Sequence, residues 1–281
     1  MKKIGFIGAG RVAVSIGKYL LERGIPVVGY YDTSPQSADE AATFTDSQAF
    51  TSEQGVIAAG DVIFIATPDD VIATVWNKIK PMNINGKVIG MFSGSLSSNL
   101  FSGIDEAGAY GASIHPMYAF SDIESDYLKL NTVPFTVEGD EQAVDFLCTL
   151  FRGLGHTITV ISPEDKVRYH AAASIASNHM IALYDMSLSM LTDCGFSREG
   201  AVLLLTPLIQ NNVSAMLKTS PEDALTGPIE RGDVDTVRHH LQDLTDEERA
   251  IYKPLAMRLI SISEKKHPER SYDEMRKLLT Q

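Results

Sequence analysis

The stretch 2-KKIGFIGAGRVA-13 decides the fold of this chain, because it runs from a strand through a glycine turn into a helix. Gly8, Gly10 and Ala13 fit the pattern G-x-G-x-x-A. The first glycine permits a tight turn, the second lets the backbone approach a pyrophosphate, and the small third residue lets helix and strand pack closely. Free amides at the helix N-terminus then bind the phosphates. We therefore predict a dinucleotide site formed by Gly8, Gly10, Arg11 and Val12.

The next strand-like run, 25-IPVVGYYD-32, ends in an acid about twenty residues after the glycines, where the ribose 2′-hydroxyl is usually bound. Asp32 favours NAD over NADP, because a carboxylate repels a 2′-phosphate. Thr33 and Ser34 follow directly and could donate hydrogen bonds to a phosphate, so NADP stays an alternative.

Beyond these two runs, strands alternate with helices up to residue 162, and the pattern predicts a Rossmann-type, mostly parallel sheet. The further strand-like runs are residues 61–67, 87–93, 109–115, 133–139 and 157–162. Only helix signals follow. Ser162-Pro163 and Ser220-Pro221 are typical helix starts, and Thr245 with Glu248 forms a capping box. We predict a dinucleotide-binding domain at 1–162 and an all-helical substrate and dimerisation domain at 163–281.

Composition limits the class of protein. The net charge of −12 argues against nucleic acid or an anionic membrane as a partner. No apolar run reaches the roughly 18 residues needed to span a bilayer. The first apolar run is broken by glycines and an arginine, so it is no signal peptide. The two cysteines lie in unrelated contexts, which suggests neither a disulfide nor a metal site and favours the cytoplasm.

Small, polar or titratable residues follow five consecutive predicted strands, at the edge where open parallel sheets bind ligands. Thr67 and Pro68 are expected to shape the wall around the nicotinamide-side ribose. Ser93 and Ser95 are expected to bind the carboxamide or the substrate. His115 is either a proton donor or a structural cap of its strand.

A second polar group lies in 168-RYHAAASIASNHM-180, which has helical character. His170, Ser174, Ser177 and Asn178 are spaced so that one helical face carries all four. Such a face either lines a site or forms hydrogen bonds that join two domains.

The chain resembles the two-domain Rossmann-like oxidoreductases whose helical C-terminal domain has carried only an uncharacterised-domain label. These are relatives of ketopantoate reductase and pyrroline-5-carboxylate reductase in the 6-phosphogluconate-dehydrogenase-like superfamily. The resemblance covers nearly the whole chain. It rests on GAGRVA (8–13), TPDD (67–70), SGSLSS (93–98), SIHPMYAF (113–120), YHAAASIASN (169–178), TPL (206–208) and ALTGPIERGD (224–233).

The resemblance implies an NAD(P)H-dependent reductase of a small anionic 2-oxo acid, with ketopantoate as first candidate, acting as a homodimer. His115 or His170 would supply the proton, and Asn178 with Ser174 would stabilise the oxyanion. Ser177 and Arg231 would bind the substrate, Arg231 gripping its carboxylate, unless Arg231 forms an ion pair with Glu230 or Asp233.

Two departures from the family pattern leave alternatives open. Many relatives have a Ser-Arg-Ser-type sequence suited to NADP where this chain has Asp32-Thr33-Ser34. The wider superfamily often has a catalytic lysine four residues before the asparagine, whereas this chain has Ser174 before Asn178. A pyrroline-5-carboxylate-type imine reductase and a cofactor-binding sensor without catalysis are the two alternative functions.

Overall fold

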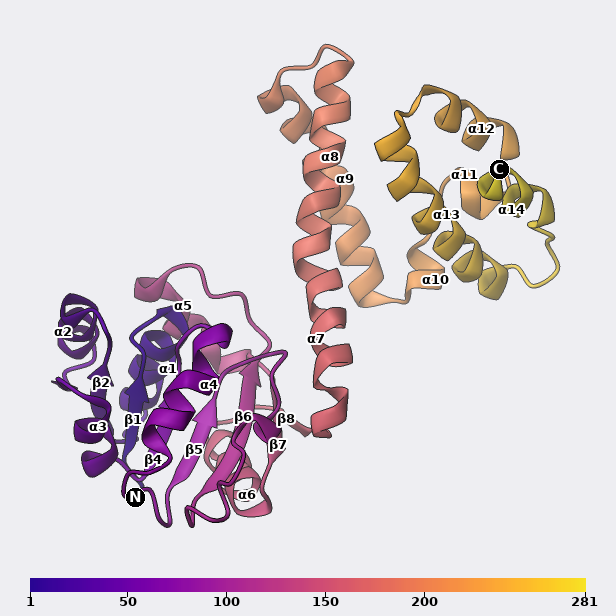
Figure 1. Ribbon diagram of the computed structural model, residues 1–281. Coiled ribbons are helices and arrows are strands. Elements are labelled where there is room, and N and C mark those ends of the chain that lie inside the picture. Colours follow the sequence, from indigo (N-terminus) through magenta and orange to yellow (C-terminus); the bar gives the residue numbers. More distant parts are fainter. The chain divides into compact units, whose positions relative to one another are not determined.

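The computed structural model describes residues 1–281 and divides into two compact units, Met1–Ile181 and Ala182–Gln281 (Figure 1). All strands lie in the first unit, where they form one sheet in the order β3-β2-β1-β4-β5-β6-β7-β8. Neighbouring strands are parallel except for the antiparallel pair of β6 and β7. The strands are β1 (Ile4–Ile7), β2 (Val27–Tyr31), β3 (Gln48–Ala49), β4 (Val62–Ile65), β5 (Val88–Met91), β6 (Tyr110–Pro116), β7 (Phe135–Gly139) and β8 (Ile158–Val160).

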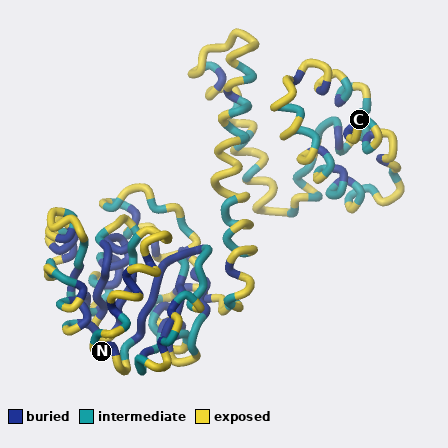
Figure 2. Tube along the Cα trace, in the orientation of Figure 1, coloured by how far each residue is buried: buried dark blue, intermediate teal, exposed yellow.

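Helices cover both faces of the sheet, as the apolar strands predict. Phe6 and Phe64 point to the face covered by α1 and α6, whereas Ile7 and Ile65 point to the face covered by α3 and α4. Figure 2 shows the resulting buried strands. The helices of this unit are α1 (Arg11–Leu21), α2 (Pro35–Phe44), α3 (Glu53–Ala59), α4 (Asp69–Ile79), α5 (Ile123–Lys129), α6 (Glu141–Gly153) and α7 (Lys166–Ser174). The Rossmann-type sheet and the helical second half are confirmed.

The strands end at Val160, close to the predicted boundary, but the first unit continues to Ile181. It does so because α7 is bound to the sheet by Lys166 and Tyr169. Ser162 is the N-cap of a 3₁₀ turn (Pro163–Asp165) that leads into α7, and Pro163 begins this turn as predicted. The Ser162 hydroxyl donates to the Asp165 side chain and accepts from no backbone amide.

The second unit contains α9 (Arg198–Lys218), α10 (Pro221–Ala224), α11 (Pro228–Arg231), α12 (Val234–Asp243), α13 (Asp246–Lys266) and α14 (Asp273–Thr280). Helix α8 (Met180–Asp193) leads into this unit. Its core joins α11, α12, α13 and α14 around Val237 and Ile260. Ser220 caps α10, and Thr245 and Glu248 form the predicted capping box at α13.

Helix α9 leaves most of its apolar side chains exposed, Leu203 and Leu217 to 75% and 77%. By length and composition it could cross a membrane, so the expectation that no segment is long and apolar enough was too strict. One such helix is weak evidence for a membrane span, and Gln210, Asn211 and Asn212 interrupt its apolar character.

Candidate active site

The glycine turn after β1 has the geometry that a dinucleotide requires. Gly8 has φ +109°, and a Cβ there would lie 2.6 Å from the carbonyl oxygen of Ala66, so only glycine fits. Gly10 precedes α1 and is exposed, and a Cβ there would meet no atom within 4 Å. Arg11 is exposed and Val12 is half-buried, while Ala13 is fully buried under the sheet. The backbone at Gly10 is therefore open to an approaching ligand, and free amides at a helix N-terminus bind phosphates.

Asp32 binds back onto this turn. Its Oδ2 accepts from the amide of Ala9 at 2.9 Å, and its Oδ1 accepts from the amide of Ser34 at 2.9 Å and from the Thr33 hydroxyl at 3.4 Å. Ser34 also accepts from the amide of Ser37 at the start of α2. The carboxylate therefore connects the ends of β1 and β2, the two strands that the ribose is expected to approach.

The serines after β5 are held by an acid from α4. Ser93 and Ser95 donate to Asp69 Oδ2 at 2.8 and 3.0 Å, and the Ser93 hydroxyl accepts from the amides of Ser95 and Leu96. Both hydroxyls are thus engaged within the protein. At the neighbouring strand end, the buried hydroxyl of Thr67 has no hydrogen-bond partner, while Pro68 is exposed at the start of α4.

His115 and Tyr169 form a hydrogen-bonded pair beside these serines. His115 is near the end of β6, and its Nδ1 lies 2.9 Å from the Tyr169 hydroxyl on α7. Burial, the nearby Lys166 ammonium and His170 lower the pKa of His115 to about 4, against a weaker opposite effect of Asp69. The ring is therefore uncharged at neutral pH. Burial raises the pKa of Tyr169, so its hydroxyl keeps its proton.

His170 lies across from His115, with ring centroids 6.2 Å apart and planes at 81°. Gly94 packs between the two rings: a Cβ there would lie 2.5 Å from His170 Cδ2 and 3.0 Å from His115 Nε2. The glycine after β5 therefore lets both imidazoles approach the segment that follows the strand.

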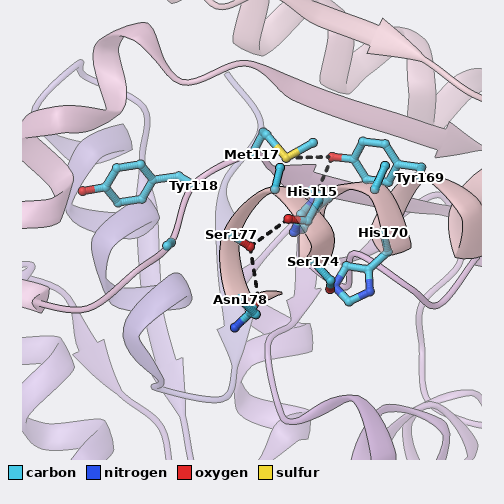
Figure 3. Close-up of a pocket in the computed structure, with 12 residues that line it drawn as sticks. His115, Met117, Tyr118, Tyr169, His170, Ser174, Ser177 and Asn178 are labelled. Carbon is cyan, nitrogen blue, oxygen red and sulfur yellow. Dashed lines mark hydrogen bonds between the residues drawn. The ribbon is translucent and has the colours of Figure 1, made fainter. Parts of the chain in front are cut away.

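The four polar residues of the predicted helical face line one pocket with these rings, as Figure 3 shows. The pocket has a volume of about 610 Å³ and also includes Met117 and Tyr118. His170 and Ser174 are half-buried, whereas Ser177 and Asn178 are exposed. The latter two lie in a π-helical turn (Ile175–His179), a distortion of the α-helix often found at functional sites. All polar residues of the pocket come from the first unit.

Arg231 lies in the second unit, exposed at the end of α11. It forms no ion pair with Glu230, whose carboxylate instead binds His267 at 2.5 Å. Asp233 caps α12 through Thr236. The guanidinium of Arg231 is thus free of the ion pairs that were its alternative explanation.

Two residues of this site were missed in the sequence, Tyr169 and Lys166. Tyr169 stands in the quoted motif, but its hydroxyl has a role only because α7 runs past the end of β6. Lys166 is fully buried next to Ser93 and Ser113. Its place in the first turn of a helix, three residues before Tyr169, was the available signal.

Two family models match parts of the chain. Residues 3–89 match "NADP oxidoreductase coenzyme F420-dependent", and residues 133–259 match "Domain of unknown function (DUF2520)". No curated protein matches.

Solved structures match over nearly the whole chain. Protein TM1727 from Thermotoga maritima is 27% identical with a TM-score of 0.75, covering 94% of this chain and 99% of its own. A Bacteroides fragilis protein described as an NADP oxidoreductase is 22% identical with a TM-score of 0.69, covering 95% and 98%. Pyrroline carboxylate reductase from Plasmodium falciparum, with NADP bound, is 18% identical with a TM-score of 0.60, covering 94% and 97%. The last two share the fold, and the matches together support an NAD(P)-dependent oxidoreductase.

Proposed function

We propose that this chain reduces the carbonyl group of a small 2-oxo acid with NAD(P)H, and that ketopantoate is the first substrate to test. The observation that carries the proposal is the His115–Tyr169 pair beside Gly94, at the same edge of the sheet as the dinucleotide turn. Reduction of a carbonyl requires a proton donor at the oxygen, and this pair supplies one that works without a charged imidazole.

The nicotinamide, when bound, supplies the hydride to the carbonyl carbon. In the resting pair the Tyr169 hydroxyl donates a hydrogen bond to His115 Nδ1, because its other neighbour, the Met117 sulfur at 3.8 Å, is a weak acceptor. The ring proton then resides on Nε2, the nitrogen beside Gly94. As negative charge develops on the substrate oxygen, Nε2 gives up its proton and Nδ1 takes the phenolic proton. Solvent restores the proton on the partly exposed Tyr169.

The other predicted residues have supporting roles in this proposal. Ser174 and Asn178 orient the substrate oxygen or a water from the pocket wall, and His170 flanks His115. Ser177 binds the substrate, although its hydroxyl also donates to the Ala173 carbonyl at 2.7 Å. Arg231 is the proposed carboxylate-binding group, because its guanidinium is exposed and unpaired.

For the cofactor, we propose NADH over NADPH. The Asp32 carboxylate stands at the end of β2 without a neutralising cation, since its partners are amides and a hydroxyl. A 2′-phosphate placed there would meet an uncompensated negative charge. Thr67, with its buried unpaired hydroxyl, and Ser93 and Ser95, held by Asp69, form the proposed wall near the nicotinamide.

We further propose a cytoplasmic homodimer that binds neither membrane nor nucleic acid. A second copy would cover the exposed Leu203, Leu204 and Leu208 of α9, because so many neighbouring apolar side chains are rarely left in contact with water. The net charge of −12 opposes binding to nucleic acid or an anionic membrane.

The alternative functions predict different turnover. A pyrroline-5-carboxylate-type reductase, favoured by the shared fold with the Plasmodium enzyme, would reduce cyclic imines and leave oxo acids untouched. A sensor would bind the cofactor and reduce neither.

The test is oxidation of NADH and NADPH by the purified protein with ketopantoate, other 2-oxo acids and cyclic imines. We expect turnover of a 2-oxo acid with NADH as the better donor. Turnover of imines alone would replace the proposal with the first alternative, and cofactor binding without any turnover would replace it with the second.

A further inference from the structure

Lys166 is the only buried lysine of the chain, with 1% of its surface exposed. Its Nζ donates to the Ser93 carbonyl at 2.7 Å and to the Ser113 hydroxyl at 2.8 Å. Ser113 donates to the same Ser93 carbonyl at 3.1 Å. No carboxylate lies within ion-pairing distance of this ammonium; Glu138, the nearby buried acid, binds Ser98 instead.

Such a burial is unfavourable for stability. Removing an ammonium from water has a large free-energy cost, and two hydrogen bonds to neutral oxygens do not replace an ion pair. An apolar side chain of similar length would fill the same space, and Ser113 would still satisfy the Ser93 carbonyl. The charge therefore needs an explanation other than folding.

The ammonium acts on the segment that supports the proposed proton donor. Residues 93–98 are held at three points by charged groups: Asp69 binds Ser93 and Ser95, Glu138 binds the amide and hydroxyl of Ser98, and Lys166 binds the Ser93 carbonyl. Gly94, which directly follows Ser93, is the residue packed against His115 and His170.

We propose that Lys166 is a positioning residue for the proton donor: it fixes the Ser93 carbonyl so that Gly94 supports the His115 ring, and its ammonium is electrostatically coupled to that ring. The chemical purpose of this arrangement rests on the proposed function. Its physical content, the coupling between Lys166 and His115, does not require turnover.

The charged and titratable groups facing His115 come from two elements. Helix α7 contributes Lys166, Tyr169 and His170, and α4 contributes Asp69, the one group that favours a charged ring. Strand β7, paired with β6, places the uncharged Thr136 opposite His115. Burial lowers the pKa of Lys166 to about 8, opposed by Glu138 and Asp69, so the amine is mostly charged at pH 7.

The experiment is an NMR titration of the His115 ring in the full-length protein, wild type against Lys166→Met. Methionine keeps the length of the stem and removes the charge. We expect the pKa of His115 to rise by at least about half a unit in the variant. Lys78→Met, which removes an exposed lysine bound to Glu53, should leave it unchanged. An unchanged His115 titration in folded Lys166→Met would overturn the proposal.

A second readout needs no variant. In the wild type, the His115 ring resonances should show a further inflection near pH 8, where Lys166 loses its proton. Absence of any second inflection between neutral pH and the ordinary lysine pKa of 10.5 would overturn the proposal even if Lys166→Met failed to fold. Because both readouts monitor the ring directly, a protein that reduces no oxo acid would still test the coupling.

Discussion

The depressed pKa of His115 predicts that the first unit loses stability in mild acid. The folded ring has a pKa of about 4, against an ordinary value of 6.5. Between these values the unfolded chain binds a proton that the folded chain does not, so stability falls as pH drops below 6.5 and levels off below 4. The difference of about 2.5 units corresponds to roughly 3.4 kcal/mol, of which about 2 kcal/mol is already lost at pH 5.

The measurement is urea unfolding at pH 7 and pH 5, followed by fluorescence. Trp76 is the only tryptophan, and it is buried on α4, so its signal reports the unfolding of the first unit alone. His115→Gln removes the titrating ring and should lower the loss between the two pH values by about 2 kcal/mol relative to wild type. Equal losses in both proteins would show that the ring is not held neutral by the fold.

Three further outcomes are expected. Tyr169→Phe should lower kcat on the order of 100-fold with little change in cofactor affinity. Tyr118→Phe, a matched change at the same pocket, should have little effect on kcat. Equal kcat values for Tyr169→Phe and wild type would remove Tyr169 from the proton path. Gly94→Ala should lower kcat by displacing the His170 ring, since the added Cβ would lie 2.5 Å from it; unaltered kinetics would contradict the packing. Asp32→Asn should shift cofactor preference toward NADPH by about tenfold, measured as the ratio of Kd values, and an unshifted ratio would end the case for NADH.

Much of the fold could be predicted because local signals and the global fold agree. The glycine turn at 8–13, the apolar runs and the capping box at Thr245 each depend on a few neighbouring residues. The two-residue β3 was missed, because so short a strand has no periodicity to detect. The helix start at Ser162-Pro163 was found, although the first turn there is a 3₁₀ turn and the one at Ser220-Pro221 is α-helical.

The site could be predicted only as a list of residues at strand ends. The sequence indicates that Ser93, Ser95 and His115 reach one edge of the sheet, since parallel strands end together. It does not show that Asp69 accepts hydrogen bonds from both serine hydroxyls, or that Tyr169 binds His115, because these contacts join residues 24 to 54 positions apart. The π-helical turn at 175–179 likewise depends on how α7 continues, which spacing alone does not reveal.

The central claim is that the glycine turn holds a nicotinamide cofactor, and calorimetric titration of NADH into wild type and Gly10→Val tests it most directly. Gly10 has φ −75°, and nothing lies within 4 Å of a Cβ added there, so valine should not disturb the empty protein. Its side chain would occupy the space of the pyrophosphate. We predict that wild type binds NADH and that Gly10→Val does not, with the unfolding midpoint reported by Trp76 unchanged. Failure of wild type to bind either NADH or NADPH, or equal binding by the variant, would contradict the account.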